Sequence, residues 1–220
     1  MKLYSGPLSL FTAKVRVALR EKGLAVEIVD VPFGRQGYQP KHPEVLRVNP
    51  KAQVPVLVDG ALELYDSTVI LEYLEDLHPE PALYPRAVAG RARCRQLELF
   101  ADEVVFKPIL PLIQEVFYEP EPARRDAAKV AEASAELRAR HADLERLLGD
   151  GEYFCGEFSV ADIGIFLCCM FGASLGVPVG EGEPRLRAWL ARTGARPAIA
   201  HEAQEMMRFS ASLPASAAAA

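Results

Sequence analysis

The sequence predicts an α/β domain joined to an all-α domain. Short strand-like segments alternate with helical ones over the first eighty residues, a proline-rich stretch follows, and only helical periodicity is found beyond it. We expect a first domain over residues 1–78, a linker over 79–86 and a helical domain over 87–209. Residues 210–220 are rich in Ser and Ala, which predicts a disordered tail.

The elements of the first domain follow from the apolar pattern. Residues 2–5 and 26–30 predict strands, and residues 11–22 between them predict a helix that stops at Gly23. A polar loop is expected to about Pro43. Residues 56–58 and 62–65 flank Asp59-Gly60, a strong hairpin signal, and Asp66-Ser67 then opens a helix. The resulting order is βαβ followed by ββα, which predicts a mixed sheet.

The second domain is predicted to contain helices throughout. One long amphipathic helix near residues 97–105 is interrupted at Pro108 and Pro111, because proline lacks the backbone donor that a helix interior needs. Further helices are expected over about 130–148, after residue 159, around Trp189, and from Pro197 to about residue 208. His141 lies on the apolar face of the helix expected over 130–148, so we expect it to be partly buried with its hydrogen bonds satisfied.

Composition and charge argue against several classes of function. The net charge of −5 and the absence of a basic stripe argue against nucleic acid as a partner. The most apolar stretch, residues 163–175, contains two glycines and is too short to span a bilayer. With no signal-peptide pattern we expect a cytoplasmic protein without membrane contact. The scattered histidines and cysteines show no metal-ligand spacing, so no metal is expected.

Three local signals in the first domain suggest ligand chemistry. Ser9 follows a strand and precedes a helix, where its hydroxyl either caps that helix or meets an anion at the positive helix end. Pro55 precedes a strand, so the Val54-Pro55 bond is either trans at a strand start or cis. In the cis case the Val54 backbone could pair with an extended peptide ligand. Asp66 and Ser67 either simply cap their helix or bind a ligand's ammonium and carboxylate groups.

Taken together, these motifs resemble the cytosolic glutathione S-transferase superfamily, serine-type. The resemblance rests on Tyr4-Ser5-Gly6-Pro7-Leu8-Ser9, Asn49-Pro50…Gln53-Val54-Pro55 and Asp66-Ser67, and extends to residues 158–162, which look like that family's buried capping box. It implies a thioredoxin-like first domain, glutathione as co-substrate and a homodimer. Leu10 and Phe11 follow Ser9 where isomerase-like members carry Ser and Cys, which weakens the maleylacetoacetate isomerase interpretation.

The resemblance also implies individual roles. Ser9 falls on the catalytic serine that hydrogen-bonds the glutathione sulfur, with Thr12 as the next candidate for that role. Val54 and a cis Pro55 fall on the backbone clamp for the cysteinyl unit. The remaining glutathione contacts fall on Lys41, Gln53, Asp66 and Ser67. For the electrophile pocket we expect Leu8, Phe11, Phe106, Leu110 and Phe117.

The function predicted from these residues is glutathione transfer to small apolar electrophiles. Two alternatives stay open: glutathione-dependent isomerisation, dehalogenation or ether cleavage on the same fold, and a non-catalytic module kept for protein interaction. The first domain contains no cysteine, so mixed-disulfide chemistry would have no protein nucleophile there.

Overall fold

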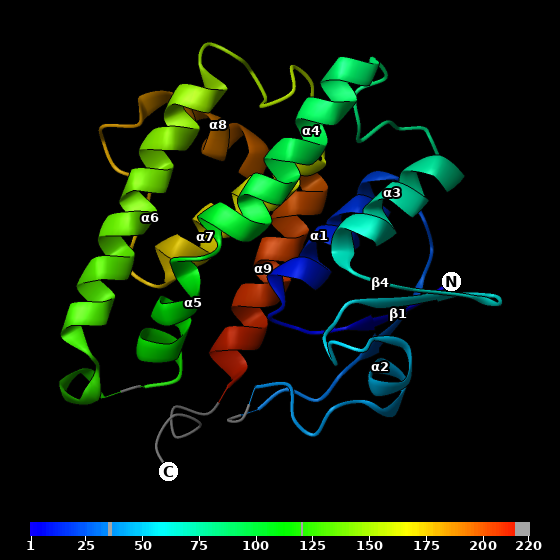
Figure 1. Ribbon diagram of the computed structural model, residues 1–220, viewed down its shortest axis with the longest axis horizontal. Helices are drawn as coiled ribbons and strands as arrows, with labels where there is room; N and C mark the ends of the chain where they lie inside the picture. The colour runs from blue at the N-terminus through cyan, green and yellow to red at the C-terminus, as the bar shows by residue number, and fades with distance from the viewer. Residues whose placement is uncertain (35–36, 120, 214–220) are drawn as a thin grey trace. The chain divides into compact units, whose positions relative to one another are not determined.

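The computed structural model describes residues 1–34, 37–119 and 121–213 of the 220-residue chain. The chain divides into two compact units (Figure 1). The first contains Met1–Leu83 together with helix α9 (Pro197–Ser212), and the second contains Tyr84–Arg196. Within the described residues, no helix combines the length and the apolar character needed to cross a membrane.

A four-stranded mixed sheet organises the first unit. Its strands are β1 (Lys2–Ser5), β2 (Glu27–Asp30), β3 (Val56–Asp59) and β4 (Leu62–Tyr65), and they lie in the order β2-β1-β3-β4. β1 pairs parallel with β2, and the β1–β3 and β3–β4 pairs are antiparallel. This topology confirms the predicted βαβ and ββα order.

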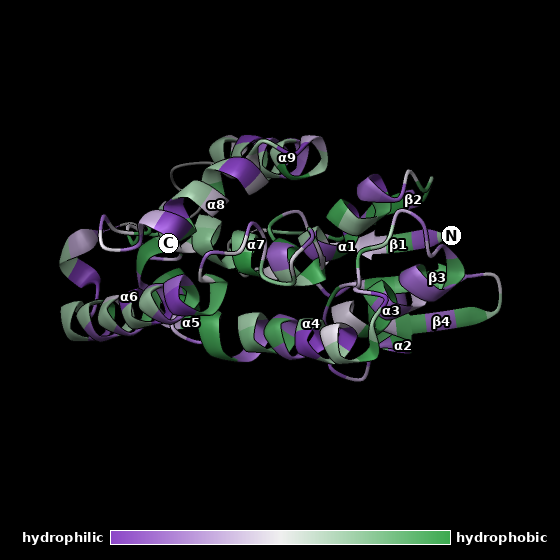
Figure 2. Ribbon diagram, turned by 90° about the horizontal axis from the view of Figure 1, so that it is seen from above, coloured by the Kyte–Doolittle hydropathy of each residue, from purple (hydrophilic) through white to green (hydrophobic). Residues whose placement is uncertain are grey.

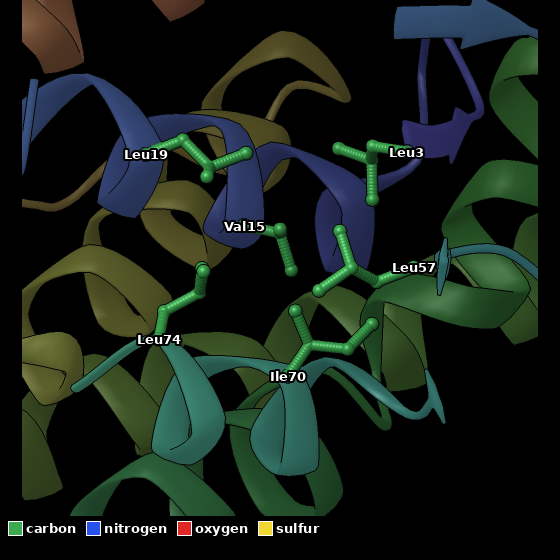
Figure 3. Packing of buried hydrophobic residues seen from close by; sticks show 6 residues of the cluster. All are labelled: Leu3, Val15, Leu19, Leu57, Ile70 and Leu74. Atoms are coloured by element: carbon green, nitrogen blue, oxygen red, sulfur yellow. The ribbon is translucent and has the colours of Figure 1, made fainter. Parts of the chain in front are cut away.

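Helices α1 (Leu10–Glu21) and α3 (Ser67–Leu77) pack on one face of this sheet. Leu3 and Leu57 are opposite each other in the β1–β3 register and both point to that face. Figure 3 shows the side chains that meet there, from the two strands and the two helices: Leu3, Val15, Leu19, Leu57, Ile70 and Leu74. All six are at most 2% exposed, so this cluster holds both helices against the sheet.

The opposite face contacts a helix that the sequence did not predict. α2 (Pro43–Val48) places Val45 against Tyr4 and Val56, whose side chains alternate with those of Leu3 and Leu57. The helix has six residues and only Val45 is buried, so its sequence shows no apolar periodicity. Its start does carry a local signal, because Pro43 occupies the first turn and the His42 ring accepts a hydrogen bond from the Glu44 amide at 3.2 Å.

The last helix differs from its predicted place and length. We expected it in the helical domain and ending near residue 208, but α9 packs against α1 in the first unit and reaches Ser212. Three residues assigned to a disordered tail are therefore helical. Leu213 follows as a bend, and residues 214–220 of the predicted tail lie outside the described residues.

The segment predicted as a linker is held by buried contacts. Lys22 forms an ion pair with Glu75 at 2.7 Å and donates to the carbonyls of His78 and Pro81. Glu75 also accepts from the amide of Leu83 at 3.0 Å. Since Lys22 and Glu75 are both buried, these bonds fix the chain where it leaves α3.

The second unit is helical, as predicted. The break predicted at Pro108 appears around Phe106–Pro108, between the π-helical turn η1 and α5. The break expected at Pro111 is wrong: Pro111 lies in the first turn of α5, where its missing amide donor is not needed. Figure 2 shows hydrophilic and hydrophobic bands alternating along α6, as expected for an amphipathic helix. In chain order the elements are α4 (Val88–Phe100), η1 (Ala101–Val105), α5 (Ile109–Leu112), η2 (Ile113–Phe117), η3 (Pro122–Arg124), α6 (Ala127–Leu148), α7 (Val160–Ser174) and α8 (Pro184–Gly194).

Two buried polar groups distinguish the core of this unit. Asp162, in the predicted capping box, accepts from the Ser159 amide and hydroxyl, from the Phe154 amide and from the Trp189 indole, at 2.8–3.2 Å. His141 is buried as expected, but the expected hydrogen bonds are wrong: among the described residues neither ring nitrogen has a partner. Asp162 is therefore a buried carboxylate with several donors, whereas the buried His141 imidazole is unsatisfied within the described residues.

Candidate functional site

The predicted site residues gather at one end of three neighbouring strands. Tyr4 pairs with Val56, and Val56 pairs with Tyr65, so these three residues form a row across β1, β3 and β4. Because the strands are antiparallel, the chain leaves β1 toward Ser9, enters β3 through Pro55 and leaves β4 toward Asp66 at the same sheet edge. Segments that are far apart in sequence thus meet at one edge.

Ser9 is the N-cap of α1. It is 9% exposed, and its Oγ accepts a hydrogen bond from the Thr12 amide at 3.2 Å. The capping role considered from the sequence is therefore real. It does not exclude the other role, because a hydroxyl that accepts through a lone pair still has its proton to donate. The amides of the first helical turn add positive potential beside that proton.

Thr12 and Tyr38 hold the loop that leads to Ser9. The Thr12 hydroxyl accepts from the Gly6 amide at 3.4 Å, and the Tyr38 hydroxyl accepts from the Leu8 amide at 3.2 Å. A Cβ on Gly6 would lie 2.7 Å from the Tyr38 ring, so only glycine fits there. Thr12 is completely buried, which assigns it to supporting the loop. Tyr38 was not predicted as a site residue, because no local pattern marks it.

Arg16 forms hydrogen bonds to the segment that leads into the same loop. Its guanidinium donates to the Ser5 hydroxyl and to the Gly6 carbonyl, the latter at 3.2 Å. It also forms a two-pronged ion pair with Glu202 of α9, with nitrogen–oxygen distances of 3.0 and 2.6 Å. Arg20 binds the second oxygen of the same carboxylate. Glu202 is completely buried, so α9 supplies the counter-charge for the arginine under the loop.

The segment before β3 contains the predicted backbone clamp. The Val54-Pro55 peptide bond is cis, as predicted. Asn49 is buried and shapes the turn, because its side chain accepts from the Lys51 amide at 2.9 Å and donates to the Gln53 carbonyl at 2.6 Å. Gln53 itself is exposed. The backbone of Val54 makes no hydrogen bond to another described residue, which leaves its N–H and C=O available.

Asp66 and Ser67 lie where β4 meets α3. Asp66 has a φ of 76° and caps the helix through the Thr68 amide, at 3.1 Å. Its second oxygen lies 3.3 Å from the Lys51 ammonium, a contact that the sequence did not indicate. Of the described non-glycine residues, only Ala52 and Asp66 have positive φ, and both lie at this edge. Backbone conformations of this kind are costly and concentrate at ligand sites.

Lys41 and Ser67 occupy the two remaining predicted glutathione positions. Lys41 is half-buried beside His42, and no acidic side chain in the described part of the chain is paired with it. Ser67 is 3% exposed and is the first residue of α3, where an amide has no partner within the helix. Both are therefore available to an anion.

The residues predicted for an electrophile pocket fall in both units. Leu8 and Phe11 are half-buried in the first unit, next to Ser9. Phe106 and Phe117 are half-buried in the second unit, and Leu110 is 49% exposed there. Phe117 packs edge-on against Tyr118 with the ring centres 5.1 Å apart.

Comparisons with known proteins point to one family. A family model described as the N-terminal domain of glutathione S-transferase matches residues 3–82. A stringent starvation protein A homolog of Coxiella burnetii is 34% identical over 166 residues, which cover 74% of this chain and 71% of that protein. Glutathione S-transferase 3 of Zea mays is 30% identical over 204 residues, which cover 90% and 91%.

A solved structure gives the same result. The theta class glutathione S-transferase from the citrus canker pathogen Xanthomonas axonopodis pv. citri, solved with glutathione bound, is similar with a TM-score of 0.79 and 28% identity. The match covers 92% of this chain and 96% of that one. Sequence and fold thus agree over almost the whole length. The chain belongs to the glutathione S-transferase superfamily.

Proposed function

We propose that this protein binds glutathione at the edge of its sheet and activates the thiol as a thiolate for attack on small apolar electrophiles. The observation that carries the proposal is the position of Ser9. Its hydroxyl proton is uncommitted, it lies at the positive end of α1, and it shares a sheet edge with the free Val54 backbone and with Asp66.

The energy required for this activation is modest. A free thiol has a pKa of about 8.5, so only a few per cent is ionised at pH 7. Lowering that pKa by about two units requires roughly 2.7 kcal/mol of preferential stabilisation of the anion. One charge-assisted hydrogen bond contributes about 1.5–3 kcal/mol, and a helix N-terminus adds about 0.3–1 kcal/mol. Ser9 acts here as a donor and forms no covalent bond.

The remaining glutathione contacts follow from the same edge. The backbone of Val54 pairs with the cysteinyl unit in the manner of an added strand, with Pro55 shaping the turn. Gln53, Asp66 and Ser67 hold the γ-glutamyl end, where Asp66 accepts from the ammonium group. Lys41 neutralises the glycine carboxylate. The electrophile contacts are assigned to Leu8, Phe11, Phe106, Leu110 and Phe117, whose apolar side chains favour apolar substrates.

The biological setting is part of the proposal. A transferase of this kind would act in detoxification, in the cytoplasm, as a homodimer. Gel filtration combined with light scattering tests the oligomeric state, and a monomer mass at micromolar concentration would contradict it.

The test of the mechanism replaces Ser9. In Ser9→Ala and Ser9→Gly we expect the pKa of bound glutathione, followed by thiolate absorbance, to return toward about 8.5. Turnover at pH 6.5 should then fall by about 50-fold, since the ionised fraction drops from about one half to about one hundredth when the pKa rises by two units. Glutathione affinity, measured by calorimetry, should change by less than about threefold.

Two features make this experiment selective. Glycine retains most of the capping preference that alanine loses, so a defect shared by both variants reports the hydroxyl and not the helix cap. Ser9→Thr keeps both the cap and the donor and serves as the matched control. A thiol pKa that stays low in all three variants would contradict the proposed role of Ser9.

A second candidate function is a non-catalytic member of the superfamily. It is favoured by the relative from Coxiella burnetii, which is named as a starvation protein and not as a transferase. A panel of conjugation, isomerisation, dehalogenation and ether-cleavage substrates run with glutathione separates these possibilities. Absence of both glutathione binding and turnover would identify the non-catalytic module.

A further inference from the structure

Three aromatic side chains from two distant segments form a row in the first unit. The ring of Phe33 packs edge-on against the ring of Tyr38, with the ring centres 4.8 Å apart. The same Phe33 ring packs edge-on against Phe209 of α9, with the ring centres 5.9 Å apart. All three rings are half-buried. This aromatic row connects the loop after β2 to the last helix of the chain.

One end of the aromatic row touches the turn that carries Ser9. The Ser9 amide donates to the Gly6 carbonyl at 3.1 Å and closes a turn over residues 6–9. The Tyr38 hydroxyl accepts from the Leu8 amide at 3.2 Å, and the Tyr38 ring packs so closely on Gly6 that a Cβ there would lie 2.7 Å from it. Because Leu8 precedes Ser9 directly, the Tyr38 hydroxyl limits where the Ser9 backbone can lie.

The other end of the aromatic row belongs to a helix that is firmly held. Ile199, Glu202 and Met206 of α9 are buried, and Phe209 follows them at the same helical spacing. Phe209 therefore lies on the face of α9 that packs on the first unit. The ion pair between Glu202 and Arg16 ties the same face to α1. A ring at the end of this face is thus a fixed support for Phe33.

The Leu8 amide is the point of the turn that depends on this support. The amide and the carbonyl of Gly6 are both bound by side chains of α1, whereas the Leu8 amide is bound by Tyr38. Catalytic groups must be held within about 0.5 Å of their working position. Without the Tyr38 hydroxyl, the Gly6 side of the turn stays in place and the Ser9 side loses its hydrogen-bonded support.

We propose that Tyr38 is a positioning residue for Ser9, and that Phe33 and Phe209 keep Tyr38 in place, so that the end of α9 helps to set the acidity of bound glutathione. This inference rests on the proposed function of Ser9 as the donor to the thiol. The aromatic row acts on the thiol through the Leu8 amide and the turn. A displaced turn moves the Ser9 hydroxyl away from the sulfur, which raises the pKa of the thiol.

Replacement of Tyr38 by Phe tests the first step, since it removes one hydroxyl and keeps the ring. We expect the pKa of bound glutathione, followed by thiolate absorbance, to rise by about one unit. Turnover at pH 6.5 should then fall by about fivefold, because the ionised fraction drops from about one half to about one tenth. At pH 9 the thiol is ionised in both proteins, so turnover should differ by less than about 1.5-fold.

Tyr73→Phe is the matched control. It also removes a hydroxyl of the first unit, one that donates to Asp59 at 2.6 Å, but Asp59 lies at the far end of β3. The control should leave the thiol pKa and turnover at both pH values unchanged. A parent-like thiol pKa in Tyr38→Phe would overturn the proposal. An equal loss of turnover at pH 6.5 and pH 9 would also overturn it, because a change of thiol pKa predicts a loss at the lower pH alone.

Replacement of Phe209 tests the contribution of α9. Phe209→Ala should raise the thiol pKa by about half a unit and lower turnover at pH 6.5 by about twofold. Met207→Ala, at a 60% exposed position of the same helix, is the control and should have no effect. The double variant Tyr38→Phe/Phe209→Ala should resemble Tyr38→Phe alone, because the row then no longer binds the Leu8 amide. Fully additive shifts would contradict a route through Tyr38.

Ser9→Ala separates this inference from the proposed function. If the thiol pKa rises in Ser9→Ala but stays at the parent value in Tyr38→Phe, the proposed function stands and the positioning role of Tyr38 is wrong. If the parent protein does not bind glutathione, or Ser9→Ala leaves the thiol pKa unchanged, both are wrong. A higher thiol pKa in both variants, with glutathione affinity by calorimetry within about threefold of the parent, is the expected result.

Discussion

At the scale of single residues, Arg16 connects the loop before Ser9 to a helix at the other end of the chain. Its guanidinium binds Ser5 and Gly6 on one side and Glu202 on the other. A buried arginine without a counter-ion is strongly unfavourable, so Glu202 is needed for Arg16 to occupy this place. The orientation of the loop therefore depends on a carboxylate 186 residues away in sequence.

Residues whose role is local were predictable from the sequence. Ser9, Pro55 and Asp66 each show their role through the adjacent strand or helix boundary, and the structure places all three at one sheet edge. Arg16 and Glu202 were missed because each looks like an ordinary charged residue on a helix. Their pairing depends on how α1 and α9 pack, which no local pattern encodes.

Replacement of Glu202 tests this dependence. Glu202→Gln should lower the free energy of unfolding by about 3 kcal/mol, because it leaves Arg16 and Arg20 without their shared charge. Urea denaturation followed by circular dichroism measures the change. The matched control is Glu205→Gln on the same helix, whose carboxylate forms an exposed pair with Arg208 and should matter by less than about 0.5 kcal/mol. Equal changes in the free energy of unfolding would show that the buried pair stabilises the protein no more than the exposed pair does.

At the scale of elements, boundaries followed from capping residues and turn signals. The Asp59-Gly60 hairpin, the start of α3 and the break near Pro108 all lie where the sequence indicated. α2 was missed because one buried residue, Val45, gives no periodicity. The helix α9 was predicted, but its apolar face does not indicate which of the two units it packs against.

The start of α7 provides the second prediction. Asp162 accepts four hydrogen bonds from Phe154, Ser159 and Trp189. Asp162→Ala should therefore destabilise the protein by about 3 kcal/mol or more, since it leaves several buried donors unpaired. Chemical denaturation gives the free energy, and calorimetry at low temperature should show unchanged glutathione binding by the folded protein.

The matched control is Asp126→Ala at the exposed start of α6. Asp126 caps its helix through the amides of Ala128 and Lys129, so we expect a loss of about 1 kcal/mol there. If both replacements had the same small effect, the buried network around Asp162 would not be a major source of stability.

At the scale of the whole molecule, the buried His141 links stability to pH. Burial, and then the charge of Arg138, lower the pKa of His141 to about 4, whereas a histidine in the unfolded chain titrates near 6.5. Between these values the unfolded state binds more protons than the folded state. Stability is therefore complete above about pH 6.5 and decreases as the pH falls toward about 4.

The expected size of this effect is about 3 kcal/mol over the window from pH 6.5 to 4. His141→Leu should remove that part of the pH dependence and raise stability at pH 5, because the leucine is not protonated and leaves no unsatisfied nitrogens. Denaturant titrations at several pH values measure it. His201→Gln, at an exposed position, is the control and should leave the slope unchanged. A parent-like slope in His141→Leu would assign the pH dependence to other groups.

Because α9 completes the first unit, that unit is discontinuous along the chain. A ribosome that has released the first eighty residues has produced the entire sheet but not the carboxylate that neutralises Arg16. The second unit is synthesised in full before Glu202 emerges. The unit that begins first is therefore finished last, and until Glu202 is synthesised Arg16 lacks the carboxylate that neutralises it in the folded protein.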